Sequence, residues 1–222
     1  MIRNRQRSIG IRKGIRGLLL PWICWSLIAS CGRPEFLTGI GTGGKYLQGK
    51  EEITRRRGGD IDKAIVSLEK VVLEDPTYKD SLTLLGRAYY MKTRYPAAFQ
   101  ILQRAVAVNP EDEIGWMVLG ITQLRLGDEE RGVKSLQGGV TLFYKVSTTG
   151  YRGFRYWDRA GKVKAATNRA AFVLRPGFEA SREEKIKAIE TLLALIDQEE
   201  WHLTMEKEMD FRREIDGVGE RR

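Results

Sequence analysis

The fold is decided by residues 79–112, which read KDSLTLLGRAYYMKTRYPAAFQILQRAVAVNPED. Residues of this stretch recur along the chain at intervals of 34 positions, so that Pro110 follows Pro76 and Gly120 follows Gly86. A fixed interval of this length indicates one helix-turn-helix unit that is copied in tandem. Two further sets keep the same interval: Ala64, Ala98 and Gly132, and Leu68, Leu102 and Leu136.

The arrangement within each unit resembles the tetratricopeptide repeat (TPR) family, in which large apolar, small, aromatic and proline residues occupy set positions. Residues 79–112 fill all of these positions and residues 113–146 fill most of them. Residues 45–78 fill them only in their second half, because Gln48 and Glu52 stand at positions of the first half. The matching residues are Leu82, Leu85, Gly86, Tyr89, Ala98, Leu102, Ala105 and Pro110, then Trp116, Leu119, Gly120, Gly132, Leu136 and Gly139, and in the first unit Ala64, Leu68, Val71 and Pro76.

The packing of two helices explains why small, large and proline residues occupy these positions. Small residues such as Gly86 and Ala98 let two antiparallel helices approach closely, and large ones such as Leu102 fill the layer between them. Pro76 and Pro110, which close the first two units, cannot continue a helix. Because one helix pair cannot bury its apolar face alone, neighbouring units must stack. We therefore expect an all-α fold: a TPR-type solenoid of about three repeats over residues 46–146, followed by a C-terminal helical pair or cap with one long helix.

The first 30 residues have the layout of a secretory signal peptide, with a basic segment before an apolar run over residues 17–29. This run is shorter than the roughly 20 residues that span a bilayer. Residues 27–31, LIASC, resemble the bacterial lipobox, which implies that Cys31 carries acyl chains such as palmitate and becomes the mature N-terminus. Gly32, where retained lipoproteins have Asp, favours the outer membrane, facing the periplasm. The alternative is an uncleaved signal anchor in which Cys31 is an ordinary residue.

Charge and cysteine content exclude several function classes. The formal net charge is +9, but residues 1–30 hold six of the 38 basic residues and no acidic one. The remainder is close to neutral, so we expect no nucleic-acid partner. Both cysteines, Cys24 and Cys31, precede the repeats, so a disulfide framework or a thiolate metal site is not expected there. Residues 31–45, rich in Gly and Thr, are predicted to form a flexible tether.

The resemblance to TPR proteins also implies a binding surface. In that family the concave wall comes from the second, fifth, ninth, twelfth and thirteenth residues of each unit. An apolar wall with arginines suits an amphipathic helix or an extended peptide that has apolar anchors and a carboxylate. The alternative is that downstream helices of the same chain cover this wall. The predicted partner groove consists of Thr83, Arg87, Tyr90, Met91, Met117, Ile121, Leu124 and Arg125, and the first unit is expected to add Tyr46, Gly49, Ile53, Arg56 and Arg57.

Residues 147–215 are predicted to form a helical extension. Basic and aromatic residues alternate over 151–157, and we interpret them as a plug that packs on the end of the last repeat, with a glycan or peptidoglycan contact as the alternative. One helix should end near Arg175, and Ser181 with Glu184 forms a capping box for the next. Its apolar stripe consists of Ile186, Ile189, Leu192, Leu193 and Ile196. The apolar stripe continues with Trp201, Met205 and Met209, which form either a packing edge or a partner surface. Residues 216–222 are expected to be disordered.

The function that these patterns favour is a membrane-tethered scaffold or adaptor that binds protein partners in a bacterial cell-envelope complex for secretion, pili or the cell wall. One alternative is a structural lipoprotein that associates with itself, and another is a cell-wall enzyme with the repeats as a platform. No catalytic constellation stands out, and the single histidine, His202, is not expected to bind a metal. We therefore predict a protein without enzymatic activity, cofactor or small-molecule substrate.

Overall fold

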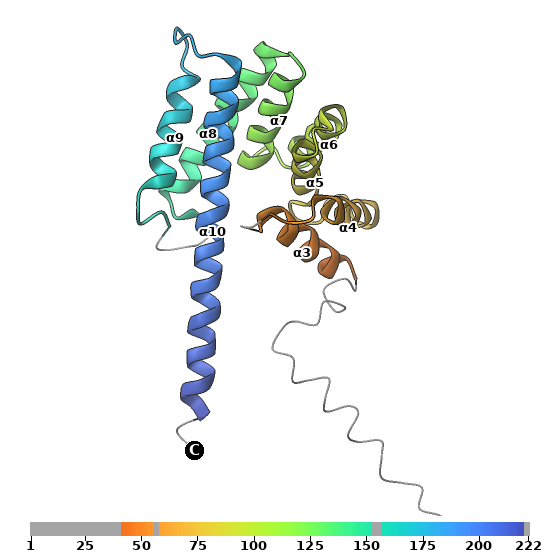
Figure 1. Ribbon diagram of the computed structural model, residues 1–222, viewed down its shortest axis with the longest axis vertical. Coiled ribbons are helices and arrows are strands. Elements are labelled where there is room, and N and C mark those ends of the chain that lie inside the picture. The colour runs from red at the N-terminus through yellow and green to blue at the C-terminus, as the bar shows by residue number, and fades with distance from the viewer. Residues whose placement is uncertain (1–40, 56–57, 152–156, 220–222) are drawn as a thin grey trace, which may run out of the picture. The chain divides into compact units, whose positions relative to one another are not determined.

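The computed structural model describes residues 41–55, 58–151 and 157–219. The chain separates into two compact units, residues 1–37 and residues 38–222, and all described residues belong to the second unit. Every regular element among the described residues is a helix (Figure 1). The expected all-α fold is therefore confirmed.

Three antiparallel helix pairs follow one another and are succeeded by two further helices (Figure 1). Each helix packs on the other member of its pair and on the next pair along the chain, as a repeat solenoid requires. The pairs are α3 (Gly41–Thr54) with α4 (Ile61–Glu74), α5 (Ser81–Met91) with α6 (Tyr95–Val108), and α7 (Glu113–Arg125) with α8 (Glu129–Thr148); α9 (Lys162–Val173) and α10 (Arg182–Gly219) complete the unit.

Short polar caps set where these helices begin. The side chain of Asp60 accepts a hydrogen bond from the backbone N–H of Lys63 at 3.0 Å, and Asp112 and Asp128 cap α7 and α8 in the same way. Such a side chain satisfies one of the free N–H groups at a helix start. The predicted capping box is confirmed, because the backbone N–H of Ser181 donates to Glu184 at 2.8 Å and the Ser181 hydroxyl accepts from the Glu184 N–H at 3.2 Å.

The two helices of each repeat touch where glycine faces leucine. A Cβ atom at Gly86 would lie 2.5 Å from Cγ of Leu102, and one at Gly120 would lie 2.5 Å from Cδ2 of Leu136. Real Cβ atoms do not come this close to a neighbour, so only glycine permits this helix spacing. The 34-residue recurrence of glycine and leucine thus reflects a repeated contact between the helices of one pair.

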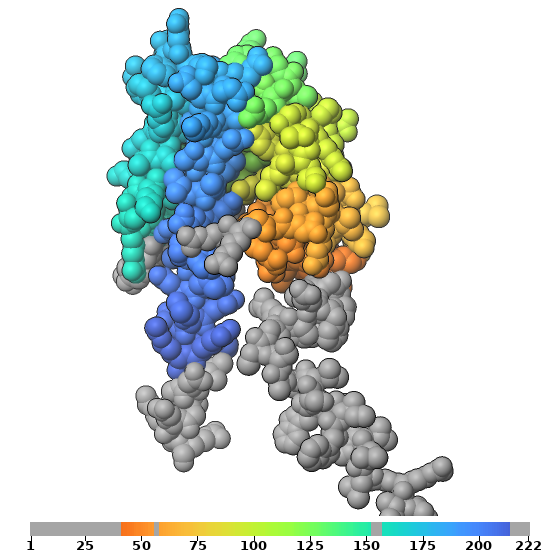
Figure 2. Space-filling model, in the orientation of Figure 1, coloured from red at the N-terminus to blue at the C-terminus, as the bar shows by residue number. Residues whose placement is uncertain are grey.

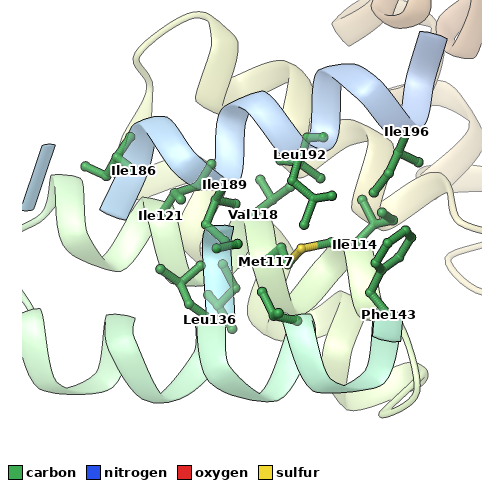
Figure 3. Packing of buried hydrophobic residues seen from close by; sticks show 14 of the residues in the cluster. Ile114, Met117, Val118, Ile121, Leu136, Phe143, Ile186, Ile189, Leu192 and Ile196 are labelled. Carbon is green, nitrogen blue, oxygen red and sulfur yellow. The ribbon is translucent and has the colours of Figure 1, made fainter. Parts of the chain in front are cut away.

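The main apolar core joins the last repeat to the C-terminal helices. Ile186, Ile189, Leu192 and Ile196 of α10 are all at most 2% exposed. They pack with residues of α7 and α8 in one cluster (Figure 3). Fully burying an aliphatic side chain of this size contributes about 1.5–3 kcal/mol, so this part of α10 is an integral layer of the core.

Aromatic residues close the end of the last repeat. Tyr151 is buried, its ring lies 5.3 Å from that of Phe143 and 4.5 Å from that of Trp157, and its hydroxyl donates to Glu113 at 2.9 Å. The predicted aromatic plug is confirmed for Tyr151 and Trp157. Residues 152–156 lie outside the described residues.

Two predicted boundaries are wrong. Helix α3 begins at Gly41, so the last five residues of the predicted tether, 41–45, are helical. They are held there by α4, because the Thr42 hydroxyl donates to Glu74 at 2.7 Å and Lys45 forms an ion pair with the same carboxylate. Helix α10 continues to Gly219, so residues 216–219 are helical instead of disordered. The charged sequence before them contains good helix formers and no proline that would end the helix.

Candidate functional site

The concave wall of the first repeat has a different register from the one that the 34-residue interval predicts. The second helices of the pairs start at Ile61, Tyr95 and Glu129, at steps of 34, but the first helices end at Thr54, Met91 and Arg125. The first of those steps is therefore 37 residues. The loop after α3 is longer than the loops after α5 and α7, and it absorbs the three extra residues.

Glycine contacts confirm this shift. A Cβ atom at Gly49 would lie 2.5 Å from Cγ of Leu68, which is the relation that Gly86 has to Leu102. Gly49 therefore takes the place that the sequence interval gave to Glu52, and it faces α4 instead of the concave wall.

The same shift moves the wall position of the first repeat to another residue. Lys50 becomes the ninth residue of the first unit and is equivalent to Arg87 of the second. The predicted wall position of Gly49 is thus wrong, Tyr46 and Ile53 are buried, and Arg56 and Arg57 lie outside the described residues.

Helix α10 lies on the concave wall of the repeats and forms ion pairs with it. Arg87 of α5 makes a forked pair with Asp197, in which Nη1 lies 2.9 Å from Oδ1. Lys50 of α3 faces Glu200 at 4.0 Å. Within the described residues, a downstream helix of the same chain therefore covers this wall, as one of the two alternatives predicted.

Arg125 of α7 provides the cation of the third repeat. It pairs with Glu183 at 2.8 Å and lies 3.9 Å from Glu190, which also accepts a hydrogen bond of 2.6 Å from the Tyr90 hydroxyl. Each repeat thus contributes one cation to a carboxylate of α10, and α10 runs from the third repeat towards the first.

The eight predicted groove residues divide into two groups. Thr83, Met117, Ile121 and Leu124 are buried in the protein, and a Cβ atom at Gly132 of α8 would lie 2.7 Å from Leu124 Cδ2, so Leu124 belongs to the contact between α7 and α8. These four contribute little accessible surface, because α8, α10 and the α7 cap enclose them, although Ile121 lines the floor of a cavity beside α10. The other four, Arg87, Tyr90, Met91 and Arg125, border the same cavity.

This cavity of about 500 Å³ remains between the repeats and α10. The repeats contribute apolar and aromatic side chains to it together with the two arginines, and Met91 at its rim is 45% exposed. Figure 2 shows α10 lying side by side with the repeats on this face, and its C-terminal half extends beyond them. From α10 the lining residues are Glu190, Leu193, Ala194 and Asp197.

A comparison with protein-family models agrees with the assignment of the repeats. A tetratricopeptide repeat family model matches residues 56–137. Over these residues the chain is similar to the tetratricopeptide repeat family. Two solved structures, titled as crystal structures of MamA, are similar to it: one is 21% identical with a TM-score of 0.45 over 73% of this chain and 81% of that chain, and the other is 22% identical with a TM-score of 0.44 over 72% and 74%. No curated protein matches the chain.

The surroundings of Arg87 favour the charged form of its guanidinium group. Burial by itself lowers the pKa of Arg87, but the charge of Asp197 and its hydrogen bonds outweigh this effect and raise that pKa above its ordinary value. Burial also raises the pKa of Tyr90, and the hydrogen bond to Glu190 adds to the shift. Tyr90 is therefore a neutral donor to a carboxylate at physiological pH.

Neither a metal-binding cluster nor a membrane-spanning helix occurs in the described part of the chain. Over residues 41–55, 58–151 and 157–219 no group of three or more His, Cys, Asp or Glu side chains is arranged to hold a metal ion. In the same ranges no helix is both long and apolar enough to cross a membrane. His202 lies on the exposed side of α10. Cys31 lies outside the described residues.

Sequence reasoning missed the acidic half of this site. Glu183, Glu190 and Asp197 are spaced by seven residues, which is two helical turns, so they share one side of α10. That spacing was readable from the sequence, but nothing in it indicated which surface the stripe would meet. Lys50 was missed because the register of α3 was wrong.

Proposed function

We propose that this chain is an adaptor that a lipidated Cys31 holds at a bacterial cell envelope, where its TPR region binds a protein partner. TPR proteins act as protein-interaction scaffolds, and the repeats here are well formed over all three pairs. The membrane anchor, the envelope location and the partner itself are parts of the proposal. The observation that carries it is the open cavity beside Tyr90 and Met91, because it leaves part of the concave wall accessible although α10 covers the rest.

The cavity suits protein binding better than catalysis. It combines apolar and aromatic walls with a few polar groups that have partners of opposite charge, as recognition sites commonly do. Its two arginines are paired with carboxylates of α10, so they are held in place to direct a polar partner. A turnover assay on cell-wall fragments tests the enzymatic alternative directly, and we expect no product.

Membrane attachment is tested first by intact mass and membrane partition of the full-length protein beside Cys31→Ser. We expect the wild type to lose residues 1–30, gain the mass of acyl chains on Cys31 and partition with membranes. The Cys31→Ser protein should keep its leader and lack that mass. An unmodified chain that stays soluble in both forms would contradict the anchor while leaving the TPR scaffold in place.

Partner binding is tested by photo-crosslinking in cells. A crosslinking amino acid at Met91, on the cavity rim, should trap a defined protein in membrane fractions. The matched control is Val66, which is comparably exposed at 50% but lies on α4 outside the cavity. The same products from both positions, or none from Met91, would count against a partner at this site.

Self-association is a second candidate, because the far end of α10 exposes apolar side chains. Trp201, Met209 and Phe211 are 39%, 50% and 64% exposed. The predicted packing edge therefore does not hold for Trp201 and Met209, which remain a surface for another molecule. Sizing of the detergent-solubilised protein beside a Trp201→Glu, Met209→Glu variant decides: a monomer in both excludes self-association through this surface.

A further inference from the structure

Helix α10 shows what kind of ligand the TPR wall accepts. Its carboxylates meet one cation in each repeat: Glu183 meets Arg125, Asp197 meets Arg87, and Glu200 faces Lys50. Lys50 and Arg87 occupy equivalent positions of the first two units, so these two cations are one repeat apart, and Arg125 follows in the third unit one helical turn further along its helix. A helix that is acidic on one side and apolar beside it is complementary to this row.

The attachment of α10 weakens along its length. Residues 186–196 carry the buried apolar stripe, whereas beyond Asp197 the only buried apolar side chain among the described residues is Leu203. The contact between Lys50 and Glu200, at 4.0 Å, is at the outer limit of an ion pair. The proximal half is therefore part of the core, and the distal half, from Asp197 onward, is held mainly by polar contacts.

The wall and the middle of α10, from Glu190 to Asp197, enclose a cavity that could take further side chains. The cavity of about 500 Å³ lies where α10 passes from the third repeat towards the first, with Ile53 and Met91 on one side and Ala194 on the other. Within the described residues, Nε of Arg125 is buried without a hydrogen-bond partner. A buried donor of this kind is costly unless an acceptor reaches it, and a partner's carboxylate would supply one.

We infer that the wall of the first two repeats binds an acidic amphipathic helix of the partner, and that the distal half of α10 is a built-in competitor for the cations Arg87 and Lys50. This inference rests on the proposed function, since it assigns the chemistry of the partner at the same site. A competitor within the chain acts at a high effective concentration, so it lowers the apparent affinity for any external helix. Partner binding then requires release of Asp197 and Glu200 from the wall.

The test measures binding of a fluorescein-labelled peptide with the sequence of residues 189–206 to the full-length protein in detergent micelles by fluorescence polarisation. A second, neutral peptide has Gln or Asn in place of all five carboxylates, which correspond to Glu190, Asp197, Glu199, Glu200 and Glu206. Asp197→Asn with Glu200→Gln in the protein should tighten binding of the acidic peptide about fivefold, because the internal competitor loses its charges. A chain that ends at Ile196 should also bind more tightly than the wild type, since it lacks both Asp197 and Glu200 and keeps the buried stripe.

Matched variants isolate the role of the cations. Arg87→Gln and Lys50→Gln should each weaken binding of the acidic peptide about fivefold, whereas Lys134→Gln, an exposed cation on α8 outside the cavity, should leave it unchanged. If Arg87→Gln fails to fold, as its thermal unfolding will show, the partly exposed Lys50 decides.

Three outcomes overturn the inference: equal binding of the neutral peptide, affinities within twofold across all variants, or no binding to any form, including the shortened chain. A partner trapped at Met91 together with one of these outcomes would leave the proposed function intact and remove only the acidic helix. Binding of the acidic peptide with no partner trapped at Met91 would support the acidic-helix site and contradict the proposed function.

Discussion

Two neighbouring glycines in α8 should respond to the same substitution with opposite signs. Gly138 is exposed, and a Cβ atom there would have no heavy atom within 4 Å. Gly139 is buried against α7, where a Cβ atom would lie 2.8 Å from the backbone nitrogen of Met117 and 3.0 Å from the backbone oxygen of Glu113. Both positions are helical, so the backbone contribution of an alanine is the same in each.

The magnitudes follow from two effects. Replacing glycine by alanine inside a helix stabilises it by about 0.8–1 kcal/mol, and Gly138→Ala should gain this amount in full. At Gly139 the methyl group meets main-chain atoms that cannot rotate away, so α7 and α8 must separate. Such overpacking costs about 1–3 kcal/mol. This cost exceeds the helical gain over most of its range, and Gly139→Ala should be less stable than the wild type by up to about 2 kcal/mol.

Thermal unfolding followed by circular dichroism at 222 nm measures both variants beside the wild type. For a chain of this size about 1 kcal/mol corresponds to 2–4 °C in melting temperature. Gly138→Ala should therefore melt a few degrees above the wild type and Gly139→Ala below it. If Gly139→Ala were as stable as Gly138→Ala, the backbones of α7 and α8 would not approach as closely as described. The explanation of the recurring small residues would then fail as well.

Three further predictions concern single side chains. Burial raises the pKa of Asp112, although hydrogen bonds from Thr83 and Gly115 oppose the shift. The contribution of Asp112 to stability is therefore present below its unfolded pKa and is lost as pH rises through its folded pKa. The melting temperature of Asp112→Asn minus that of the wild type should therefore increase from pH 4 to pH 7. Ser181→Ala removes half of the capping box of α10 and should cost about 1 kcal/mol in urea unfolding. Phe143→Ala empties a fully buried site beside Tyr151 and should cost about 3–5 kcal/mol, seen as a lower urea midpoint.

Much of the fold was predictable because the sequence repeats a physical contact. Glycine facing leucine between two helices has to recur wherever two backbones approach to the same distance, so the 34-residue interval reveals each pair. The capping box at Ser181 and the apolar stripe from Ile186 to Ile196 are local patterns, which a sequence states without reference to the rest of the fold. These elements were predicted with their correct positions.

The first repeat shows where this reasoning stops. Its helix α3 looked degraded because an interval of 34 was applied across a loop that had lengthened by three residues. Gly49 was in the sequence, but only its contact with Leu68 shows that it takes the role of Gly86. A loop length leaves no periodic trace, so the shift and the wall residue Lys50 were inaccessible without the structure.

The partner groove was predicted only in part for a different reason. The sequence of an amphipathic helix shows which of its sides is apolar but not which surface will cover that side. The repeats bind α10 in the way that they could bind a helix from another chain. Of the predicted groove residues, Arg87, Tyr90, Met91, Ile121 and Arg125 border the cavity beside α10. Whether the chain itself or a partner faces them depends on the length and direction of the connection through α9, which no local pattern encodes.

The two halves of α10 explain how a TPR wall that is covered by a helix of its own chain can still bind a partner. If apolar burial held the whole helix, each aliphatic residue would add about 1.5–3 kcal/mol, and no partner of ordinary affinity would displace it. Here the continuous apolar stripe ends at Ile196, Leu203 is the one buried apolar side chain beyond it among the described residues, and the other contacts there are polar, such as the pair of Lys50 with Glu200. Pairs of this kind are individually worth about 0–1 kcal/mol, which a partner helix of similar charge can replace at little net cost. The division between apolar and acidic contacts along α10 therefore separates the part that stabilises the fold from the part that can yield to a partner.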